Sequence, residues 1–234
     1  MILSDIGRAI GQLGDPRFRR VLWLGLALTI VLLIAVYAVF LGVLNWLLPE
    51  TVAIPWIGEV TWINGLLSGA SLIAMLVLSV FLMVPVASAF SSLFLEDVTD
   101  AVEARYYPDQ PPAPRLGFAA GLADSLNYMV VLIVANLLAL IPYLLFAPAA
   151  PLIFLALNGY LLSREYFHLI ATRRLGRASA KALRRRHGAQ VWAAGIVMAI
   201  PLTIPLVNLL IPIIGAAAFT HLFHRVNAAR GRAI

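Results

Sequence analysis

A run of 28 uncharged residues, from Val21 to Leu48, constrains the fold of this chain more than any other feature. A helix of that length measures about 42 Å, which exceeds the hydrocarbon core of a bilayer at about 30 Å. The run is preceded by Asp15-Pro16-Arg17-Phe18-Arg19-Arg20. A basic cluster beside an apolar run predicts that this end stays in the cytoplasm. We therefore predict a membrane helix over residues 16–48, with Asp15 as its N-cap and Pro16 as its first residue.

The composition of the whole chain supports a membrane protein. Of its 234 residues, 62% are hydrophobic and 12% are charged, whereas soluble domains carry about 25% charge. The first apolar run is too long and begins too late for a cleavable signal peptide. We attribute the net charge of +6 to membrane topology, and we expect no nucleic-acid partner because no binding motif for one occurs. The absence of cysteine excludes disulfides and thiolate metal sites.

Three further apolar runs follow; Pro85 alone interrupts the first, and three prolines break each of the other two. Residues 62–95 continue into a charged helix, so one long transmembrane helix is predicted over 62–107. Residues 118–163 contain three central prolines and meet cations at both ends, which predicts a helical hairpin. Residues 191–224 are too few for two crossings, which need about 40 residues. One crossing would leave three arginines on the opposite side, so a re-entrant hairpin is predicted there.

The distribution of the cations gives the topology. All 17 Lys and Arg residues lie in segments 1–20, 96–117, 164–190 and 225–234. We therefore predict one integral membrane domain over 1–234, with both termini cytoplasmic. It has an amphipathic helix at 1–14 and a basic cytoplasmic helix or loop at 164–190. The fold class is all-α, with two long transmembrane helices and two Pro-broken, hemi-penetrating hairpins. Broken backbone at membrane depth must be covered by protein or by water, which predicts a homo-oligomer or a polar cavity.

The basic cluster at the start of the first long helix is the best candidate for binding chemistry. Arg17, Arg19 and Arg20 supply guanidinium groups, and the backbone at Phe18 supplies a helix-terminal N–H group. Such groups suit a tetrahedral dianion such as sulfate or phosphate. The alternative interpretation is a topology determinant that contacts lipid headgroups.

An acidic helix face is the second candidate. The carboxylates of Glu96, Asp100 and Glu103 are spaced i, i+4, i+7 and share one side of a helix. Together with Arg105 and the pair Arg164-Glu165, they form a possible ion-pair gate. The alternative is a solvated helix face.

The sequence predicts neither metal nor enzyme chemistry. Glu165 and His168 have the E-x-x-H spacing of a di-metal carboxylate site, but such sites need two copies and one is present. The pair His221 and His224 has no third ligand. No phosphate-binding loop and no nucleophile motif occurs. We expect no enzyme activity, no metal and no cofactor.

Four stretches of this chain are similar to the CysZ-type sulfate permease family of bacterial inner membranes. The first, Asp15–Arg20, resembles that family's Pro-x-x-Arg-Arg turn before the first long helix. The second, Phe94–Arg105, is similar to the end of its second long helix. The third, Leu157–Phe167, looks like the helix that leaves its first hairpin. The fourth, Ile200–Pro212, contains Pro-Leu-x-Asn-Leu as its second hairpin does.

The resemblance implies a function as well as a fold. It implies an oligomer with two long helices and two hemi-penetrating hairpins that takes up sulfate for cysteine biosynthesis. Anion would bind at the turn before the first long helix, where Arg19 and Arg20 match the arginines of the family. Arg17 stands where many members have glycine. The alternative function is a non-transporting membrane scaffold or regulatory protein of the same fold.

Overall fold

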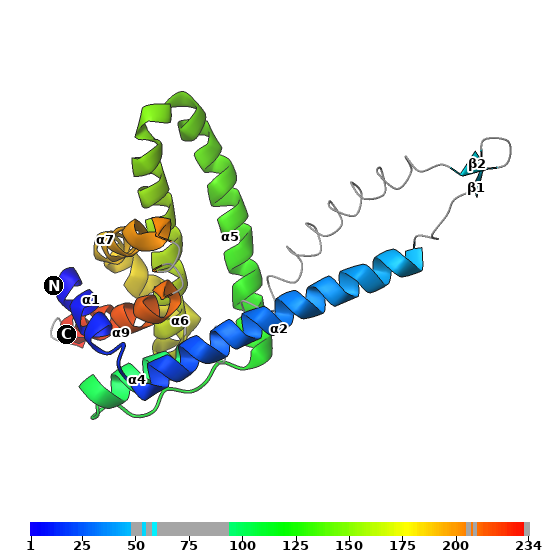
Figure 1. Ribbon diagram of the computed structural model, residues 1–234. Coiled ribbons are helices and arrows are strands. Elements are labelled where there is room, and N and C mark those ends of the chain that lie inside the picture. The colour runs from blue at the N-terminus through cyan, green and yellow to red at the C-terminus, as the bar shows by residue number, and fades with distance from the viewer. Residues whose placement is uncertain (48–52, 55–57, 60–93, 205–206, 208–209, 232–234) are drawn as a thin grey trace.

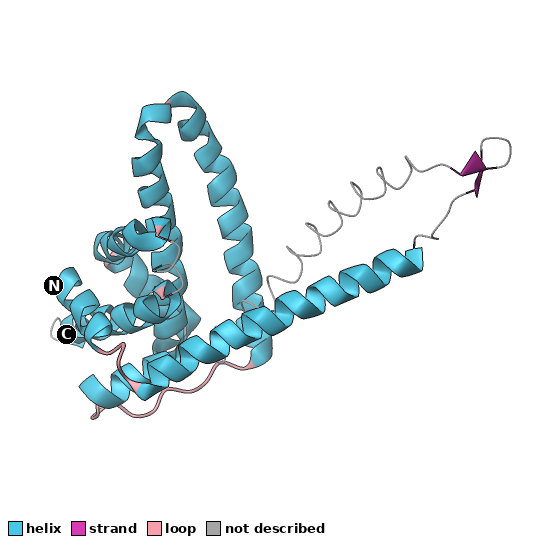
Figure 2. Cartoon of the chain, in the orientation of Figure 1, coloured by secondary structure: helices cyan, strands magenta, loops and turns pink. Residues whose placement is uncertain are grey.

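The computed structural model describes residues 1–47, 53–54, 58–59, 94–204, 207 and 210–231. These residues are helical except for loops and one pair of very short strands (Figure 2). The strands are β1 (Ala53–Ile54) and β2 (Gly58–Glu59), which pair antiparallel. The all-α prediction is confirmed.

The N-terminal part forms two helices joined by a tight turn. Helix α1 spans Ile2–Gly11 and helix α2 spans Pro16–Leu47. The N–H of Arg17 donates to Oδ1 of Asp15 at 2.8 Å. Because a side-chain oxygen that accepts from the second helical residue is the defining contact of an N-cap, the predicted cap is confirmed. Figure 1 shows α2 projecting away from the other helices.

Most of the predicted second long helix, 62–107, lies outside the described residues. Its charged end is helix α4, Glu96–Tyr106. Helix α4 packs against the first turns of α2 and against helix α9. The loop that follows α4 contains four prolines and leads to helix α5.

Helices α5 (Phe118–Leu145) and α6 (Ala150–Arg186) form a hairpin, with the short 3-10 helix η2 (Ala147–Ala149) at its tip (Figure 1). The predicted boundary at residue 163 is not a helix end, because no helix breaker occurs there. The change of direction comes later, at Gly176, whose φ of 76° lies in the left-handed region that favours glycine. The basic segment 164–190 therefore continues the hairpin helix before it turns.

The C-terminal part contains α7 (Gly188–Ala199), the 3-10 helix η3 (Ile200–Thr203) and α9 (Ile211–Gly231). The predicted re-entrant hairpin, 191–224, falls on these elements, although residues 205–206 and 208–209 lie outside the described residues. Helix α9 continues past the predicted end of that hairpin. Its side chains from Ile213 to His224 are buried, which makes α9 the centre of the core.

The cover for α9 comes from the same chain. Helices α1, α4 and α6 pack around it, and the largest buried side chains there are aromatic. Phe219 and Phe223 contact Tyr166 and Phe167 of α6. We expected a neighbouring subunit to cover this arm of the second hairpin, whereas intrachain packing already does so. The predicted homo-oligomer stays a prediction.

The described part of the chain contains one helix segment that could span a membrane. This segment, Ala119–Leu145, is long and apolar enough to cross a bilayer, with a mean hydropathy of 2.3 in its most apolar window. Only 6% of that window is buried inside the structure. The exposed surface of this segment is apolar, with Val130, Leu138 and Leu144 among its most exposed side chains.

Candidate functional site

The arginine turn, which we define as residues 15–20, has two distinct sides. Phe18 is 1% exposed and Val21 is 2% exposed, and both belong to the hydrophobic core. The side chains of Arg17, Arg19 and Arg20 are exposed. Since the aromatic ring anchors the turn in the core, the three guanidinium groups are presented to the outside at a fixed helix start.

The backbone of this turn is partly occupied. The N–H of Arg17 donates to the Asp15 carboxylate, and the N–H of Arg19 donates to the Asp15 carbonyl at 3.1 Å. Neither amide is available to an anion in this geometry. Binding of a dianion here would therefore depend chiefly on the guanidinium groups, and the contribution of the Phe18 backbone stays a prediction.

A residue that the sequence did not single out supports the turn. Gln12 is 0% exposed, and its Nε2 lies 3.3 Å from Oδ2 of Asp15 and 3.2 Å from the carbonyl oxygen of Ala101. Its position on a short amphipathic helix gave no indication of this role. Only the tertiary approach of α4 to the turn brings Ala101 within reach.

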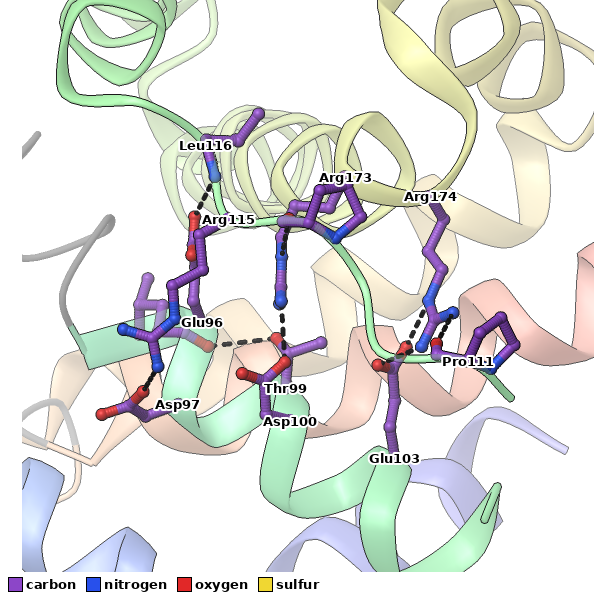
Figure 3. A network of polar contacts seen from close by, with 12 residues as sticks. Glu96, Asp97, Thr99, Asp100, Glu103, Pro111, Arg115, Leu116, Arg173 and Arg174 are labelled. Carbon is purple, nitrogen blue, oxygen red and sulfur yellow. Dashed lines mark hydrogen bonds and ion pairs between the residues drawn. The ribbon is translucent and has the colours of Figure 1, made fainter. Parts of the chain in front are cut away.

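Figure 3 shows the acidic face of α4 beside arginines, but these are not the predicted Arg105 and Arg164. Asp97 pairs with Arg115 and Asp100 pairs with Arg173, each at 2.7 Å. Glu103 pairs with Arg174.

Arg105 and Arg164 take no part in the ion pairs of the described residues. Arg105 instead lies 5.5 Å from the centroid of the Tyr106 ring. The sixth residue of the predicted gate, Glu165, interacts with Tyr128 on α5. Of the six predicted gate residues, Arg105 and Arg164 therefore lie outside the ion-pair network of α4. Glu165 interacts within the α5–α6 hairpin instead.

The Glu103 cluster, consisting of Glu103, Arg174, His224 and Tyr107, lies where α4, α6 and α9 meet. Nε of Arg174 donates to Oε1 of Glu103 at 3.0 Å, and Nε2 of His224 lies 2.9 Å from the same oxygen. The ring of Tyr107 stacks on His224 with centroids 4.0 Å apart. Burial alone would raise the pKa of Glu103, but the hydrogen bonds from His224 and Arg174 outweigh burial and hold that pKa below its usual value.

Glu96 is in a different electrostatic position on the same face. It is 0% exposed, and its Oε1 accepts from the N–H of Leu116 at 3.2 Å. Burial raises its pKa, while the nearby Arg173 acts in the opposite direction.

The loop between α4 and α5 joins the same network. The Arg173 side chain, itself 1% exposed, donates to the carbonyl of Pro114, and Arg174 donates to that of Pro111. The network therefore fixes this loop to α4 and α6. A role as a gate stays a prediction.

The described residues contain no group of three or more His, Cys, Asp or Glu side chains placed to hold a metal ion. Glu165 and His168 point to separate partners, because His168 Nε2 lies 3.7 Å from Asp124. His221 accepts or donates a hydrogen bond with the Tyr107 hydroxyl at 3.0 Å. The expectation of no metal stays a prediction for the whole chain.

The fold and the arginine turn define a helical membrane protein with a positively charged helix start. The chain matches the family described as "Sulfate transporter CysZ/Etoposide-induced protein 2.4" over residues 5–212. It belongs to this family, which confirms the resemblance seen in the sequence. None of the curated proteins matches the chain.

Proposed function

We propose that this chain is a permease for sulfate or a closely related oxyanion, and that it supplies sulfate for cysteine biosynthesis. The family supports a sulfate transporter in general terms. The observation that carries the specific proposal is the arginine turn, which exposes three guanidinium groups while Phe18 anchors it in the core. Guanidinium forks match the oxygen geometry of a tetrahedral dianion.

The proposed setting is the bacterial inner membrane, with several passes, both termini in the cytoplasm and a homo-oligomeric assembly. Two observations support this setting. The cations are confined to four segments of the sequence, and the α5–α6 hairpin exposes apolar side chains along its length. Lipid or a second copy of the chain would cover that surface.

The Asp124–Arg177 ion pair would lie at the base of the hairpin. It joins Oδ1 of Asp124 to Nε of Arg177 at 3.0 Å, and the most exposed apolar residues of α5 begin just beyond it, at Leu126. We propose that this level marks the cytoplasmic boundary of the membrane, because paired charges are favourable in the interfacial region and unfavourable in hydrocarbon.

Substitution of Arg19 and Arg20 by alanine is expected to lower the rate of sulfate uptake. Each substitution removes a charge-assisted contact, so we expect a fall of at least about tenfold at subsaturating sulfate. The measurement is uptake of labelled sulfate into proteoliposomes that contain the purified protein. The matched control is Arg185→Ala/Arg186→Ala, which removes the same charge from two exposed positions on α6. Equal uptake by the two double variants would reject the arginine turn as the binding site.

The topology has its own test. Single cysteines introduced at Thr51 and Ser179 are expected to react with a membrane-impermeant maleimide from opposite faces of inner-membrane vesicles. The native chain has no cysteine, so every label reports the introduced position. Labelling of both positions from one face would contradict the proposed layout.

A second candidate function is supported by the far end of α6. Lys181, Arg185 and Arg186 are exposed, and they form no ion pair within the described residues. Such a surface suits an acidic partner protein, which is the scaffold or regulatory alternative. Absence of sulfate uptake, together with stoichiometric co-purification of an acidic soluble protein that Lys181→Gln/Arg185→Gln abolishes, would favour this function.

A further inference from the structure

The turn between α1 and α2 contains a buried amide that connects two elements. Gln12 has no exposed surface, although glutamine is usually exposed. Its Nε2 faces the carbonyl of Ala101 on α4 and Oδ2 of Asp15. Both partners are acceptors, which fixes the amide with its nitrogen toward them, since an amide oxygen there would face two oxygens. The side chain thus joins α4 to the N-cap of α2.

The Asp15 carboxylate is held at both of its oxygens. Oδ2 receives the amide of Gln12 and Oδ1 receives the N–H of Arg17. A continuous path of hydrogen bonds therefore runs from α4 through Gln12 and Asp15 to the first arginine of the turn. The backbone reinforces it, because the N–H of Asp15 donates to the carbonyl of Gln12 at 2.9 Å.

Helix α1 holds Gln12 in place from the other side. Asp5 pairs with Arg225 of α9, with Oδ2 and Nη2 2.6 Å apart, and Ala9 is 0% exposed against the core. Asp5, Ala9 and the C-cap residue Gln12 are spaced i, i+4, i+7, so they lie on the side of α1 that docks on the protein. The exposed side of α1 carries Leu3 and Ile10.

We propose that Gln12 is a positioning residue for oxyanion binding at the arginine turn. The proposal rests on the proposed function. A carboxylate within a cluster of arginines competes with the dianion, because it attracts the same guanidinium groups and repels a negatively charged ligand. Gln12 keeps the Asp15 carboxylate on the cap and fixes the start of α2 against α4. The three guanidinium groups then remain directed outward.

Two substitutions of Gln12 separate this role from simple packing. Gln12→Met keeps the length of the side chain and removes the donor. Gln12→Glu places a second carboxylate against two acceptors. Both are expected to raise the KM for sulfate about tenfold, which corresponds to one hydrogen bond to a charged group, with kcat within about twofold of wild type. Gln190→Glu makes the same change at an exposed position on α7 and is the matched control.

The Gln12→Glu variant adds a readout that a packing defect would not give. The negative charge of Asp15 disfavours ionisation of a carboxyl group that faces it. The introduced glutamate is therefore expected to be protonated at pH 5. The carboxylic acid then donates to Asp15 as the amide does. KM of this variant relative to wild type is expected to recover at pH 5, while the ratio for Gln12→Met stays unchanged. Absence of this selective recovery, with both variants folded, would overturn the role of the donated hydrogen bond.

A transport-independent measurement distinguishes failure of this inference from failure of the proposed function. Trypsin cleaves after arginine, and release of the turn is expected to raise cleavage after Arg17 and Arg19 in Gln12→Met but not in Gln190→Glu. Mass spectrometry of timed digests in detergent measures it. Unchanged cleavage, or raised cleavage with unchanged KM, would overturn the inference. If wild type transports no sulfate, the proposed function is rejected. Raised cleavage in Gln12→Met would in that case still show that Gln12 holds the turn in place.

Discussion

Glu103→Gln is expected to lower the free energy of unfolding by about 3 kcal/mol, because it leaves a buried arginine without its counter-charge. The Glu103 and Arg174 side chains are 7% and 10% exposed, and His224 shares the carboxylate. Glutamine keeps the shape of the side chain but presents a donor group where two donors already converge. The measurement is the unfolding midpoint and slope in a denaturant titration of the purified protein in detergent.

Asp97→Asn is the matched control for this variant. It makes the equivalent change on the same helix, but the Asp97–Arg115 pair is exposed, at 39% and 62% for the two side chains. Exposed ion pairs contribute about 0–1 kcal/mol because solvent screens them. Equal losses in the two variants would show that the Glu103 cluster is not the buried anchor that the structure indicates.

The stability difference between wild type and Glu103→Gln is expected to depend on pH. The pKa of Glu103 is lowered in the folded protein from its usual 4.5. A group whose folded pKa is lowered stabilises the protein above its unfolded pKa, and that contribution is lost as pH falls through the folded pKa. The stability difference between wild type and Glu103→Gln is therefore expected to be full at neutral pH and to shrink below about pH 4.5. A difference that grows on acidification would contradict the assignment.

What the sequence could predict depends on whether the information was local. The N-cap at Asp15 depends on its immediate neighbours, and the structure contains it. The acidic face of α4 also follows from helical spacing. Its partners do not, because Arg173 and Arg174 lie about 70 residues away and reach α4 only through the fold. Nearness in sequence suggested Arg105, which the structure places over a tyrosine ring instead.

The boundaries of the hairpins show the same limit. Charge patterning placed the end of the first hairpin at residue 163, where the first cation follows. A helix ends where its backbone is interrupted, however, and the change of direction is set by Gly176. The cover of α9 by α1 was not predictable either, because it brings together the two ends of the chain, as the Asp5–Arg225 pair shows. Gln12 was missed for the same reason.

A substitution at the contact between α6 and α7 is also expected to lower the stability of the protein strongly. The two backbones approach so closely at Gly159 and Gly195 that a Cβ at Gly195 would lie 1.9 Å from the carbonyl oxygen of Gly159 and 2.8 Å from Cβ of Ser163. Small residues at helix crossings allow this approach in membrane proteins. The indole N–H of Trp192 donates to the carbonyl of Ala156 at 3.0 Å across the same crossing.

Gly195→Ala is therefore expected to destabilise the protein by about 3 kcal/mol, since the obstructing atom is backbone and cannot rotate away. The helices must separate, which weakens the Trp192 hydrogen bond and the packing of α7. The measurement is the thermal unfolding midpoint in detergent, with tryptophan fluorescence to report the crossing.

Gly188→Ala is the matched control, because a Cβ at Gly188 at the start of the same helix meets nothing within 4 Å. Alanine there is expected to be neutral or slightly stabilising. Equal unfolding temperatures for the two variants would contradict a close crossing of α6 and α7 at Gly159 and Gly195.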